Sequence, residues 1–516
     1  MLRFLLSVAL TLTVFINLNA SEPVHNLFSN SSESVQKFAE LCYTFPADSL
    51  ADLIYNYNDF PEPQGRDTLL TLTNTLNDSL EVPYHLYIPE QYNPQKKTPL
   101  VVWMHGGVSR PEFIEDASEW MDHPIVTTCS ETGWLVLIPM GKVNVTWFDD
   151  LGMRNVMEQI RHLKMNYNID DDRVVGCGFS DGGSGSFLFA MRTPTDFAVL
   201  FPWSGHPGVG GFVTNTPSYL TNLRNRTLFA SNGGLDRLYP ADALQPIMQL
   251  AIDDGADLNF TVYDTAGHNY GYMESEFKLF SQRVIDNPRH PFQPSLYWES
   301  AYMLHNRVDW LEITALDTSL EEAYWHEDIN FNMKNDRLTI GFNHDQTYEG
   351  EGVKVAMLVD DPEVPAVQMG LSVGDIVVAM DNIPTPDISS LGAAKDSSAR
   401  GQAFTLTVKR DDQQLVLQGA FPEVNYYKAF LRNRASGAVN VSRVGNDFYV
   451  RTSRIGGIRL YIHPEMVRLD QPVCVFVDGE LRYDAMVKPD SKFMVDQFVL
   501  NRDRRSLWIN AIDIRL

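Results

Sequence analysis

Short apolar segments alternate with helical patterns over residues 82–288. Six of the apolar segments predict strands, at 99–104, 134–140, 173–178, 198–203, 227–231 and 258–263. Between the second and third of these, Val156, Ile160 and Leu163 recur at helical spacing, and Asp149 or Asp150 can cap the helix that they predict. Strands that alternate with helices are typical of a mainly parallel sheet covered on both faces. The pattern therefore predicts a doubly wound α/β domain over residues 81–288.

Ahead of this domain, a lead segment at 21–80 contains a helical pattern over 35–57 that is broken at Pro46. Beyond residue 289 the pattern changes to alternating strands with few helices, as in 307–314 and 337–342, and it resumes over 438–516. Residues 347–420 do not continue the strand pattern of the segments before and after them. The simplest organisation is a β-sandwich-like module whose halves, 289–346 and 421–516, flank an inserted unit. Two separate small β domains would give the same pattern.

The first twenty residues have the features of a secretory signal peptide. Arg3 precedes an apolar run at 5–16, and the small residue Ala20 follows as the expected cleavage point. We therefore expect a secreted or periplasmic protein; an uncleaved N-terminal anchor is the alternative. No later segment has about 18 uninterrupted apolar residues, so the sequence predicts no stable membrane insertion.

The overall composition narrows the function classes. The chain has 516 residues and a formal net charge of −25, which repels polyanions and argues against nucleic-acid binding. A chain of this length is expected to form more than one domain. Four cysteines, at 42, 129, 177 and 474, do not make a disulfide framework, and we predict no specific bridge.

The strongest chemical motif is Gly178-Phe179-Ser180-Asp181-Gly182-Gly183, placed between a predicted strand and a predicted helix. A nucleophile on such a tight turn needs small neighbours, because strand and helix approach closely there. The N-terminus of the helix also favours the negative charge that develops on a substrate oxygen. The motif and its context predict Ser180 as a catalytic nucleophile.

Two glycines end the strand at 99–104, in Trp103-Met104-His105-Gly106-Gly107. A backbone N–H near Gly107 or Val108, together with the N–H of Asp181, would form an oxyanion hole.

The base should follow the nucleophile in this topology, which points to His268 after the strand at 258–263. His206 is a competitor that we expect to line the pocket or cap a turn. The acid should follow the strand at 227–231, which points to Asp236, with Asp264 as a rival.

Several aromatic residues lie next to these loops in the sequence. Trp147, Trp203, Tyr270 and Tyr272 could line an acyl or sugar pocket, although aromatic residues at strand ends are more often part of a core. Zinc and phosphate motifs are not supported, because His326-Glu327 has no second histidine at the required spacing and Gly141-Lys142 lacks the flanking pattern of a phosphate loop. We expect neither a metal nor a cofactor.

Taken together, these motifs resemble the α/β-hydrolase superfamily over residues 82–280. Within it, the chain is similar to secreted esterases such as feruloyl and acetyl-xylan esterases and polyhydroxybutyrate depolymerases, on the segments 83–89, 105–107, 172–174, 195–197 and 267–268. The resemblance implies Ser180 as nucleophile, Asp236 as acid, His268 as base, and oxyanion donors near Gly107 and at Asp181. It also implies a small-molecule or polysaccharide-linked ester as substrate.

The inserted unit resembles a PDZ domain of the kind found in bacterial proteases. The resemblance rests on Gly350-Glu351-Gly352-Val353, similar to a loop that holds a C-terminal carboxylate, and on the string at 365–376. It implies Gly350, Gly352 and Val353 as peptide-binding residues and a strand-addition groove beside 353–358. A structural spacer is the alternative.

The sequence as a whole predicts a secreted serine esterase that works through a Ser-His-Asp triad and an acyl-enzyme. Two other functions remain open. One is a serine peptidase of the prolyl-oligopeptidase type, which the PDZ-like unit favours and the short N-terminal segment disfavours. The other is a catalytically silent binding protein that uses the PDZ-like and β modules.

Overall fold

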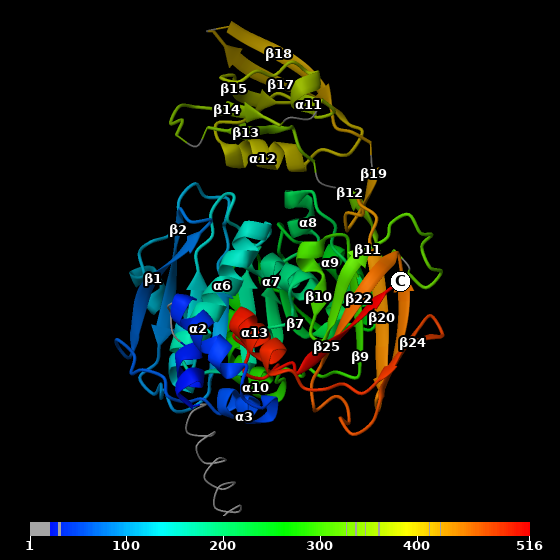
Figure 1. Ribbon diagram of the computed structural model, residues 1–516. Helices are drawn as coiled ribbons and strands as arrows, with labels where there is room; N and C mark the ends of the chain where they lie inside the picture. The colour runs from blue at the N-terminus through cyan, green and yellow to red at the C-terminus, as the bar shows by residue number, and fades with distance from the viewer. Residues whose placement is uncertain are drawn as a thin grey trace, which may run out of the picture. The chain divides into compact units, whose positions relative to one another are not determined.

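A computed structural model describes residues 21–28, 32–326, 328–335, 338–345, 347–359, 362–411, 413–423 and 425–516. The signal peptide expected at residues 1–20 lies outside the described residues. The chain divides into two compact units: a main unit, Met1–Asn330 with Phe430–Leu516, and an inserted unit, Phe331–Ala429 (Figure 1). Within the described ranges, no helix has both the length and the hydropathy that crossing a membrane requires.

An eight-stranded sheet organises the α/β part of the main unit. Its strands are β1 (Thr68–Leu76), β2 (Leu80–Ile88), β3 (Thr98–Met104), β4 (Leu135–Pro139), β5 (Ile169–Phe179), β6 (Val199–Trp203), β7 (Thr227–Gly233) and β8 (Leu258–Tyr263). Their spatial order is β1-β2-β4-β3-β5-β6-β7-β8. The pairs β1–β2 and β2–β4 are antiparallel and the others are parallel. The predicted mainly parallel sheet is confirmed, and the six predicted strands correspond to β3–β8.

Helices cover both faces of this sheet. They are α4 (Ser118–Met121), α5 (Pro124–Thr132), α6 (Asp150–Asn166), α7 (Asp181–Arg192), α8 (Val209–Thr214), η1 (Leu220–Asn225), α9 (Ala241–Asp253), η2 (Tyr270–Tyr272) and α10 (Met273–Asp286). On β2, Tyr84 faces α6, where its hydroxyl lies 2.7 Å from Nδ1 of His162. Tyr87 points to the opposite face and shares a buried cluster with Ile125 of α5 and Phe280 of α10. Asp149 caps α6, since its side chain accepts from the N–H of Gly152 at 2.8 Å.

A β-sandwich completes the main unit. One sheet has the order β10-β11-β22-β25 and the other β24-β23-β21-β20-β9. The strands are β9 (Ser295–Ser300), β10 (Arg307–Val308), β11 (Leu311–Leu316), β20 (Gly437–Val444), β21 (Asp447–Ser453), β22 (Ile455–Ile462), β23 (Val473–Val477), β24 (Glu480–Ala485) and β25 (Asn510–Arg515), with the short helix η3 (Met303–His305). Inward side chains of both sheets form one apolar core, because alternate residues of each strand point the same way.

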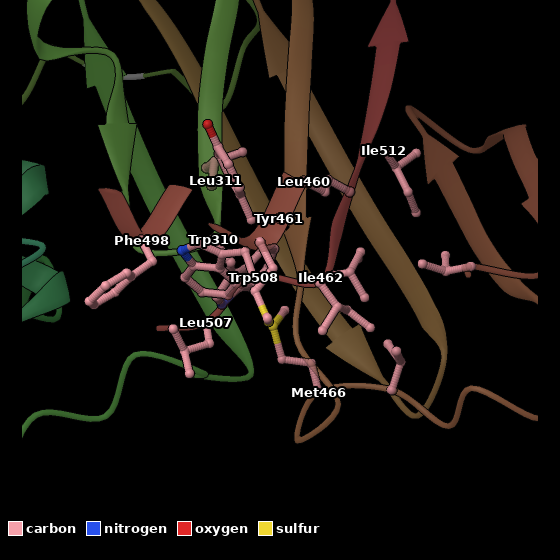
Figure 2. Close-up of a cluster of buried hydrophobic side chains, with 14 of the residues drawn as sticks. Trp310, Leu311, Leu460, Tyr461, Ile462, Met466, Phe498, Leu507, Trp508 and Ile512 are labelled. Atoms are coloured by element: carbon pink, nitrogen blue, oxygen red, sulfur yellow. The ribbon is translucent and has the colours of Figure 1, made fainter. Parts of the chain in front are cut away.

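Trp310, Tyr461 and Trp508 lie close together in this core (Figure 2). Three helices close it: α2 (Ser32–Cys42), α3 (Ala47–Tyr55) and α13 (Ser491–Asn501). The N-terminal segment therefore packs with the C-terminal part of the chain, and the predicted helix break at Pro46 separates α2 from α3.

Charged side chains join the α/β part to the sandwich. Arg226 pairs with Asp309 at 2.5 Å, and Arg289 pairs with Asp503 at 2.7 Å; all four side chains are at most 5% exposed. Asn222 adds an amide hydrogen bond of 2.9 Å to the carbonyl of Glu299 on β9. The two parts are therefore held in one compact unit by polar contacts that exclude water.

The inserted unit has its own sheet and its own apolar core. Its elements are β12 (Asn332–Asn335), β13 (Phe342–His344), β14 (Val353–Leu358), α11 (Pro365–Gln368), β15 (Ile376–Met380), β16 (Ile383–Pro384), α12 (Ile388–Asp396), β17 (Ala403–Arg410), β18 (Gln413–Ala420) and β19 (Asn425–Lys428). The sheet order is β13-β14-β15-β17-β18, with β16 beside β15; β12 pairs with β19.

The strand expected at 337–342 differs in the structure, where β13 begins only at Phe342. Before it, the carbonyl of Ile340 accepts from Ala366 at 2.7 Å and that of Gly341 accepts from Val359 at 2.9 Å. These bonds, and a φ of 97° at Gly341, bend the backbone away from a strand. The segment also belongs to the inserted unit, not to the sandwich.

The groove expected beside residues 353–358 is wrong, because β14 pairs with β13 on one side and with β15 on the other. The peptide-binding residues expected there are wrong as well. The N–H of Gly352 donates to the carbonyl of Pro386 at 2.8 Å, and Val353 is a buried core residue opposite Val377. Gly350 lies against the ring of Tyr348 in the same loop. A strand with two partners has no free edge for a peptide.

Candidate active site

Ser180 sits on a strained turn between β5 and α7. Its φ of 60° and ψ of −119° are rare for a residue with a side chain and cost of order 1–3 kcal/mol. Two backbone bonds hold the turn: the N–H of Ser180 donates to Trp203 at 3.0 Å, and the N–H of Ser184 donates to the carbonyl of Ser180 at 2.9 Å. The turn leaves the Ser180 hydroxyl at the carboxyl end of β5, only partly exposed.

Glycines permit this turn because backbones touch around it. A Cβ added at Gly178 or Gly182 would overlap the carbonyl of Met104 on β3, and one added at Gly183 would overlap the carbonyl of Trp203 on β6. Gly182 and Gly183, in the first turn of α7, weaken the helix by roughly 1 kcal/mol each. Close packing against two strands requires them nevertheless.

The structure brings Ser180, His268 and Asp236 together in one hydrogen-bonded chain. Nδ1 of His268 lies 2.7 Å from Oδ2 of Asp236, and Nε2 lies 2.9 Å from Oγ of Ser180. An ionised carboxylate can only accept, so Nδ1–H donates to Asp236 and Nε2 is left to accept the hydroxyl proton of Ser180. The rival acid Asp264 is exposed and has no such bond in the described residues.

Asp236 is itself held in place. Its side chain is fully buried, and its second oxygen, Oδ1, accepts the N–H groups of Leu238 and Tyr239 at 2.8 and 2.9 Å. These bonds fix the carboxylate toward His268, whose side chain is 23% exposed. The chain of bonds therefore runs from a buried carboxylate outward to Ser180.

Buried His105 fixes the loop that faces Ser180. Its Nδ1–H donates to the carbonyl of Gly106 at 2.8 Å, and its Nε2 accepts the N–H of Gly141 at 3.0 Å. Burial lowers the pKa of His105 to about 4, so the ring is neutral and can play both roles. The N–H of Gly107 belongs to the same peptide plane as the Gly106 carbonyl and therefore points away from His105.

The side chain of Asp181 fixes the next peptide, since Oδ2 accepts the N–H of Val108 at 3.0 Å. Of the two donors expected near Gly107, Val108 is therefore already engaged. Within the described part of the chain, the N–H groups of Gly107 and Asp181 have no acceptor. These two N–H groups are therefore free to donate to a ligand. A Cβ added at the neighbouring Gly106 would lie 3.1 Å from Cβ of Ser180, which shows how close the loop comes.

Aromatic rings surround the imidazole of His268. Phe179 lies 5.2 Å from it, Tyr239 lies 5.7 Å from it, and Tyr270 packs on Phe179 at 4.6 Å between ring centroids. His123 contacts Tyr270 from α5. Tyr270 was expected near the site, and 46% of it is exposed. Phe179, Tyr239 and His123 were missed; the first two lie within three residues of Ser180 or Asp236, but no sequence signal marks His123.

Three of the aromatic residues expected in the pocket, Trp147, Trp203 and Tyr272, are buried. Trp147 and Trp203 are fully buried, and their indole N–H groups donate to the carbonyl of His105 at 2.8 Å and to Glu276 at 3.2 Å. Neither has surface left for a ligand, so both support the site from the core. His206 is partly exposed, and its Nδ1 accepts the N–H of Gly208 at 3.0 Å, which makes it a turn cap. Tyr272 is buried, and its hydroxyl lies 2.9 Å from Oγ of Ser204.

A concave surface lies within the inserted unit. A groove of about 430 Å³ is lined by residues 338–342 just before and at the start of β13 and by Ile388, Leu391 and Lys395 of α12. β13 is the edge strand of its sheet. The N–H groups of Ile340 and Gly341 have no acceptor among the described residues.

Comparisons with known proteins agree with the α/β geometry. Residues 141–287 match the dienelactone hydrolase family. This chain carries an α/β-hydrolase-like fold with an additional β-rich region. A bifunctional acetylxylan esterase/xylanase of Neocallimastix patriciarum, XynS20E, is 29% identical over 130 residues, which are 25% of this chain and 18% of that protein.

Two solved structures are similar at lower identity. A thermostable esterase is 21% identical, with a TM-score of 0.35, over 43% of this chain and 64% of its own. A ferulic acid esterase is 16% identical, with a TM-score of 0.36, over 42% of this chain and 98% of its own. The family match, at residues 141–287, lies within the α/β part, and the chain spans 18% of the length of its curated relative.

In the described residues, no group of three or more His, Cys, Asp or Glu side chains is arranged to hold a metal ion.

Proposed function

We propose that this protein is a serine esterase that hydrolyses carboxylic esters with Ser180 as nucleophile. The observation that carries the proposal is the chain of hydrogen bonds from buried Asp236 through His268 to Ser180. A serine hydroxyl is a weak nucleophile unless a base takes its proton, and the geometry supplies a base already oriented by a carboxylate.

The mechanism follows from this geometry. Nε2 of His268 takes the proton of Ser180 as Oγ attacks the ester carbonyl, and Asp236 stabilises the imidazolium that forms. The N–H groups of Gly107 and Asp181 stabilise the oxyanion. The imidazolium then protonates the leaving alcohol, and the acyl group stays on Oγ. Water, activated by His268, releases the acid and restores Ser180. This sequence requires no cofactor.

For the substrate, we propose a neutral ester, free or attached to a polysaccharide, such as an acetyl or feruloyl ester. Exposed Leu235 and Leu238 flank Asp236, and the Phe179–Tyr270 ring pair adds apolar surface beside His268. The net charge of −25 disfavours polyanionic substrates. The acetylxylan and ferulic acid esterases among the relatives support the same substrate class. We also propose that residues 1–20 direct export, which would give access to such polymers.

Hydrolysis of short-chain p-nitrophenyl esters, methyl ferulate and a peptide amide tests the proposal, using the full mature chain beside Ser180→Ala. Ester turnover should fall by at least about 10³-fold in the variant, because the acyl-enzyme cannot form. Ser79→Ala is the control, since this exposed hydroxyl only contacts the carbonyl of Asn77 in a distant turn.

Other results of this assay would favour a different function or a different nucleophile. Cleavage of the peptide amide would favour a serine peptidase of the prolyl-oligopeptidase type. No turnover of any ester, with normal folding, would favour a silent binding protein. Ester activity that survives in Ser180→Ala would mean that the nucleophile is misassigned.

A second candidate function concerns the inserted unit, for which we propose peptide binding of the PDZ type in the groove beside β13. A peptide could add a strand to this edge and place its carboxylate at the free N–H groups of Ile340 and Gly341. Lys395 lines the same groove, but its ammonium pairs with Asp396 at 2.9 Å and donates to the carbonyl of Leu338 at 3.1 Å, so backbone N–H groups would supply most of the recognition. This site replaces the loop around Gly352 that the sequence indicated.

Fluorescence anisotropy of labelled peptides with the full chain tests this second function. A library of hydrophobic C-termini should bind as free carboxylates and not as amides. Ile388→Asp, in the groove and 47% exposed, should abolish binding, whereas Ile383→Asp, 51% exposed on β16, should not. Equal affinity for amides, or equal loss in both variants, would leave the unit as a structural spacer.

A further inference from the structure

A partly open polar cavity lies between the α/β part and the sandwich of the main unit. Its volume is about 150 Å³, roughly ten times what one ordered water needs. Arg161, Arg192 and Thr193 line it from the α/β part, and Arg307, Ser506 and Trp508 line it from the sandwich. Trp508 belongs to the sandwich core (Figure 2). The cavity is therefore built by both parts of the main unit.

Arg192, at the end of α7, is buried in this wall without a carboxylate partner. Its guanidinium donates to the hydroxyl of Thr216 and to the carbonyls of Pro217, at 3.1 Å, and Phe148, at 3.5 Å. All three acceptors are neutral. Burial lowers the pKa of Arg192, and the carboxylate of Asp150 offsets only part of this effect.

Arg161 and Arg307 also lack a carboxylate partner. Nε of Arg161 is buried without a hydrogen-bond partner. Arg307 donates to the backbone carbonyl of Asp309 at 3.1 Å and lies over the ring of Tyr461 at 3.7 Å. Among the described residues, no carboxylate lies within 4.0 Å of the guanidinium of Arg161, Arg192 or Arg307.

The two acids in the cavity wall each have a cationic partner, although Lys164 is shared between Asp196 and Asp171. Asp196 pairs with Lys164 at 2.8 Å, and Asp503 pairs with Arg289 at 2.7 Å. His305 in the same wall pairs with Asp150 at 3.0 Å. In the wall itself the three arginines outnumber the two acids, although the chain as a whole carries −25.

Ser506 adds a buried hydroxyl group to the cavity wall. It is 6% exposed, and its Oγ is buried without a hydrogen-bond partner. A buried hydroxyl left unpaired costs free energy of the order of a lost hydrogen bond. A ligand oxygen in the cavity would satisfy it.

From these contacts we infer that the cavity binds a small oxyanion of the phosphate or sulfate class, held by Arg161, Arg192 and Arg307 with Ser506 as a neutral donor. Guanidinium groups match tetrahedral oxyanions through paired N–H donors. Because the arginines come from both sides, the anion links the α/β part to the sandwich. The site is separate from the proposed esterase chemistry: Arg192 lies at the opposite end of α7 from Ser180, about 17 Å along a helix of this length.

Binding of inorganic phosphate to the full chain tests the inference. In isothermal titration at constant ionic strength, phosphate should bind saturably, and the melting temperature should rise by about 1–3 °C for each tenfold excess over Kd relative to chloride. Sulfate should compete with phosphate. Arg161→Gln should weaken phosphate binding at least tenfold while ester turnover stays unchanged, which separates this site from Ser180.

Two further variants keep the result interpretable. Ser506→Ala removes a neutral donor and should weaken phosphate binding by a smaller factor than Arg161→Gln. Arg468→Gln, an exposed arginine paired with Asp470, should bind phosphate like the parent chain. The inference is overturned if phosphate and chloride give the same melting temperature with no saturable heat, or if Arg161→Gln binds phosphate with unchanged affinity.

Discussion

The catalytic edge of the large sheet and the junction with the sandwich are built in opposite ways. At the edge, the contiguous residues 178–183 form the turn that carries Ser180, and glycines let the backbones touch there. At the junction, charged side chains from distant parts of the chain meet in the interior. Arg289 and Asp503 are 214 residues apart, and Arg504 and Asp171 are 333 apart.

This difference predicts that substitutions at the edge change turnover, whereas substitutions at the junction change stability. The chemistry of the edge depends on a few atoms in a strained turn, so loss of one group should abolish turnover and leave the fold intact. The junction depends on paired charges whose desolvation is costly, so loss of one partner should unfold the main unit and leave the chemistry of the folded fraction unchanged.

The largest expected effect comes from Asp236→Asn at the edge. The amide keeps the shape but disfavours the His268 tautomer whose Nε2 accepts from Ser180, so kcat for ester hydrolysis should fall by roughly 10³- to 10⁴-fold. Steady-state kinetics measure the loss of kcat, and a melting curve shows whether the fold stays intact. Asp264→Asn, an exposed acid on the neighbouring loop, is the control and should keep full activity. A similar loss in both variants would contradict the assignment of Asp236.

At the junction, Arg289→Met should lower the free energy of unfolding by about 3–5 kcal/mol, because Asp503 is left buried without its cation. The double variant with Asp503→Leu should recover most of this loss. Arg482→Met removes an exposed pair with Glu480 and should cost less than about 1 kcal/mol. Denaturant unfolding gives these values. A changed kcat in folded Arg289→Met would break the separation between the two regions.

Asp181 is a charged residue at the edge, and we propose that it acts by positioning the loop that carries Gly107. Asp181→Ala frees the N–H of Val108 and should loosen the loop that carries Gly107, lowering kcat about 10- to 100-fold with a smaller change in KM. Asp181→Asn keeps an acceptor oxygen and should restore most of the rate. Kinetics of the two variants distinguish position from charge: equal loss in both would assign the effect to the charge.

The smallest effect is on stability against acid. Burial lowers the pKa of His105, His123, His206 and His463 to about 4, from the usual 6.5. In the unfolded chain these groups take up protons below pH 6.5, so their contribution is complete above pH 6.5 and is lost as the pH falls toward 4. Melting temperatures between pH 7 and 4 should fall accordingly. His463→Gln should make the decline shallower, by about 1 kcal/mol per pH unit at most, and exposed His290→Gln should not.

Much of the α/β part could be predicted because its signals are local. Six strands, the helix capped by Asp149 and the turn at Ser180 each follow from side-chain periodicity or from a short motif. The pairing of His268 with Asp236 was also predicted, since the order of strands limits which loops meet at one edge of a sheet.

The errors arose where a residue type fits two environments. Trp147 and Trp203 are apolar enough for a pocket or a core, and only their neighbours place them in the core. Residues 350–353 resemble a binding loop, but β14 has partners on both sides, and the free edge belongs to β13. Periodicity shows which side of a strand is buried, but not which element buries it.

The sequence by itself determined the elements of the α/β part and the residues of the turn that we propose as catalytic, because strand periodicity, capping and glycine spacing act over a few residues. Only the tertiary structure decided that the N-terminal helices close the sandwich core and that buried charges join the two parts of the main unit. Only the tertiary structure also decided that three arginines face one cavity without carboxylates. Long-range pairing depends on which surfaces exclude water together, and no local pattern records that.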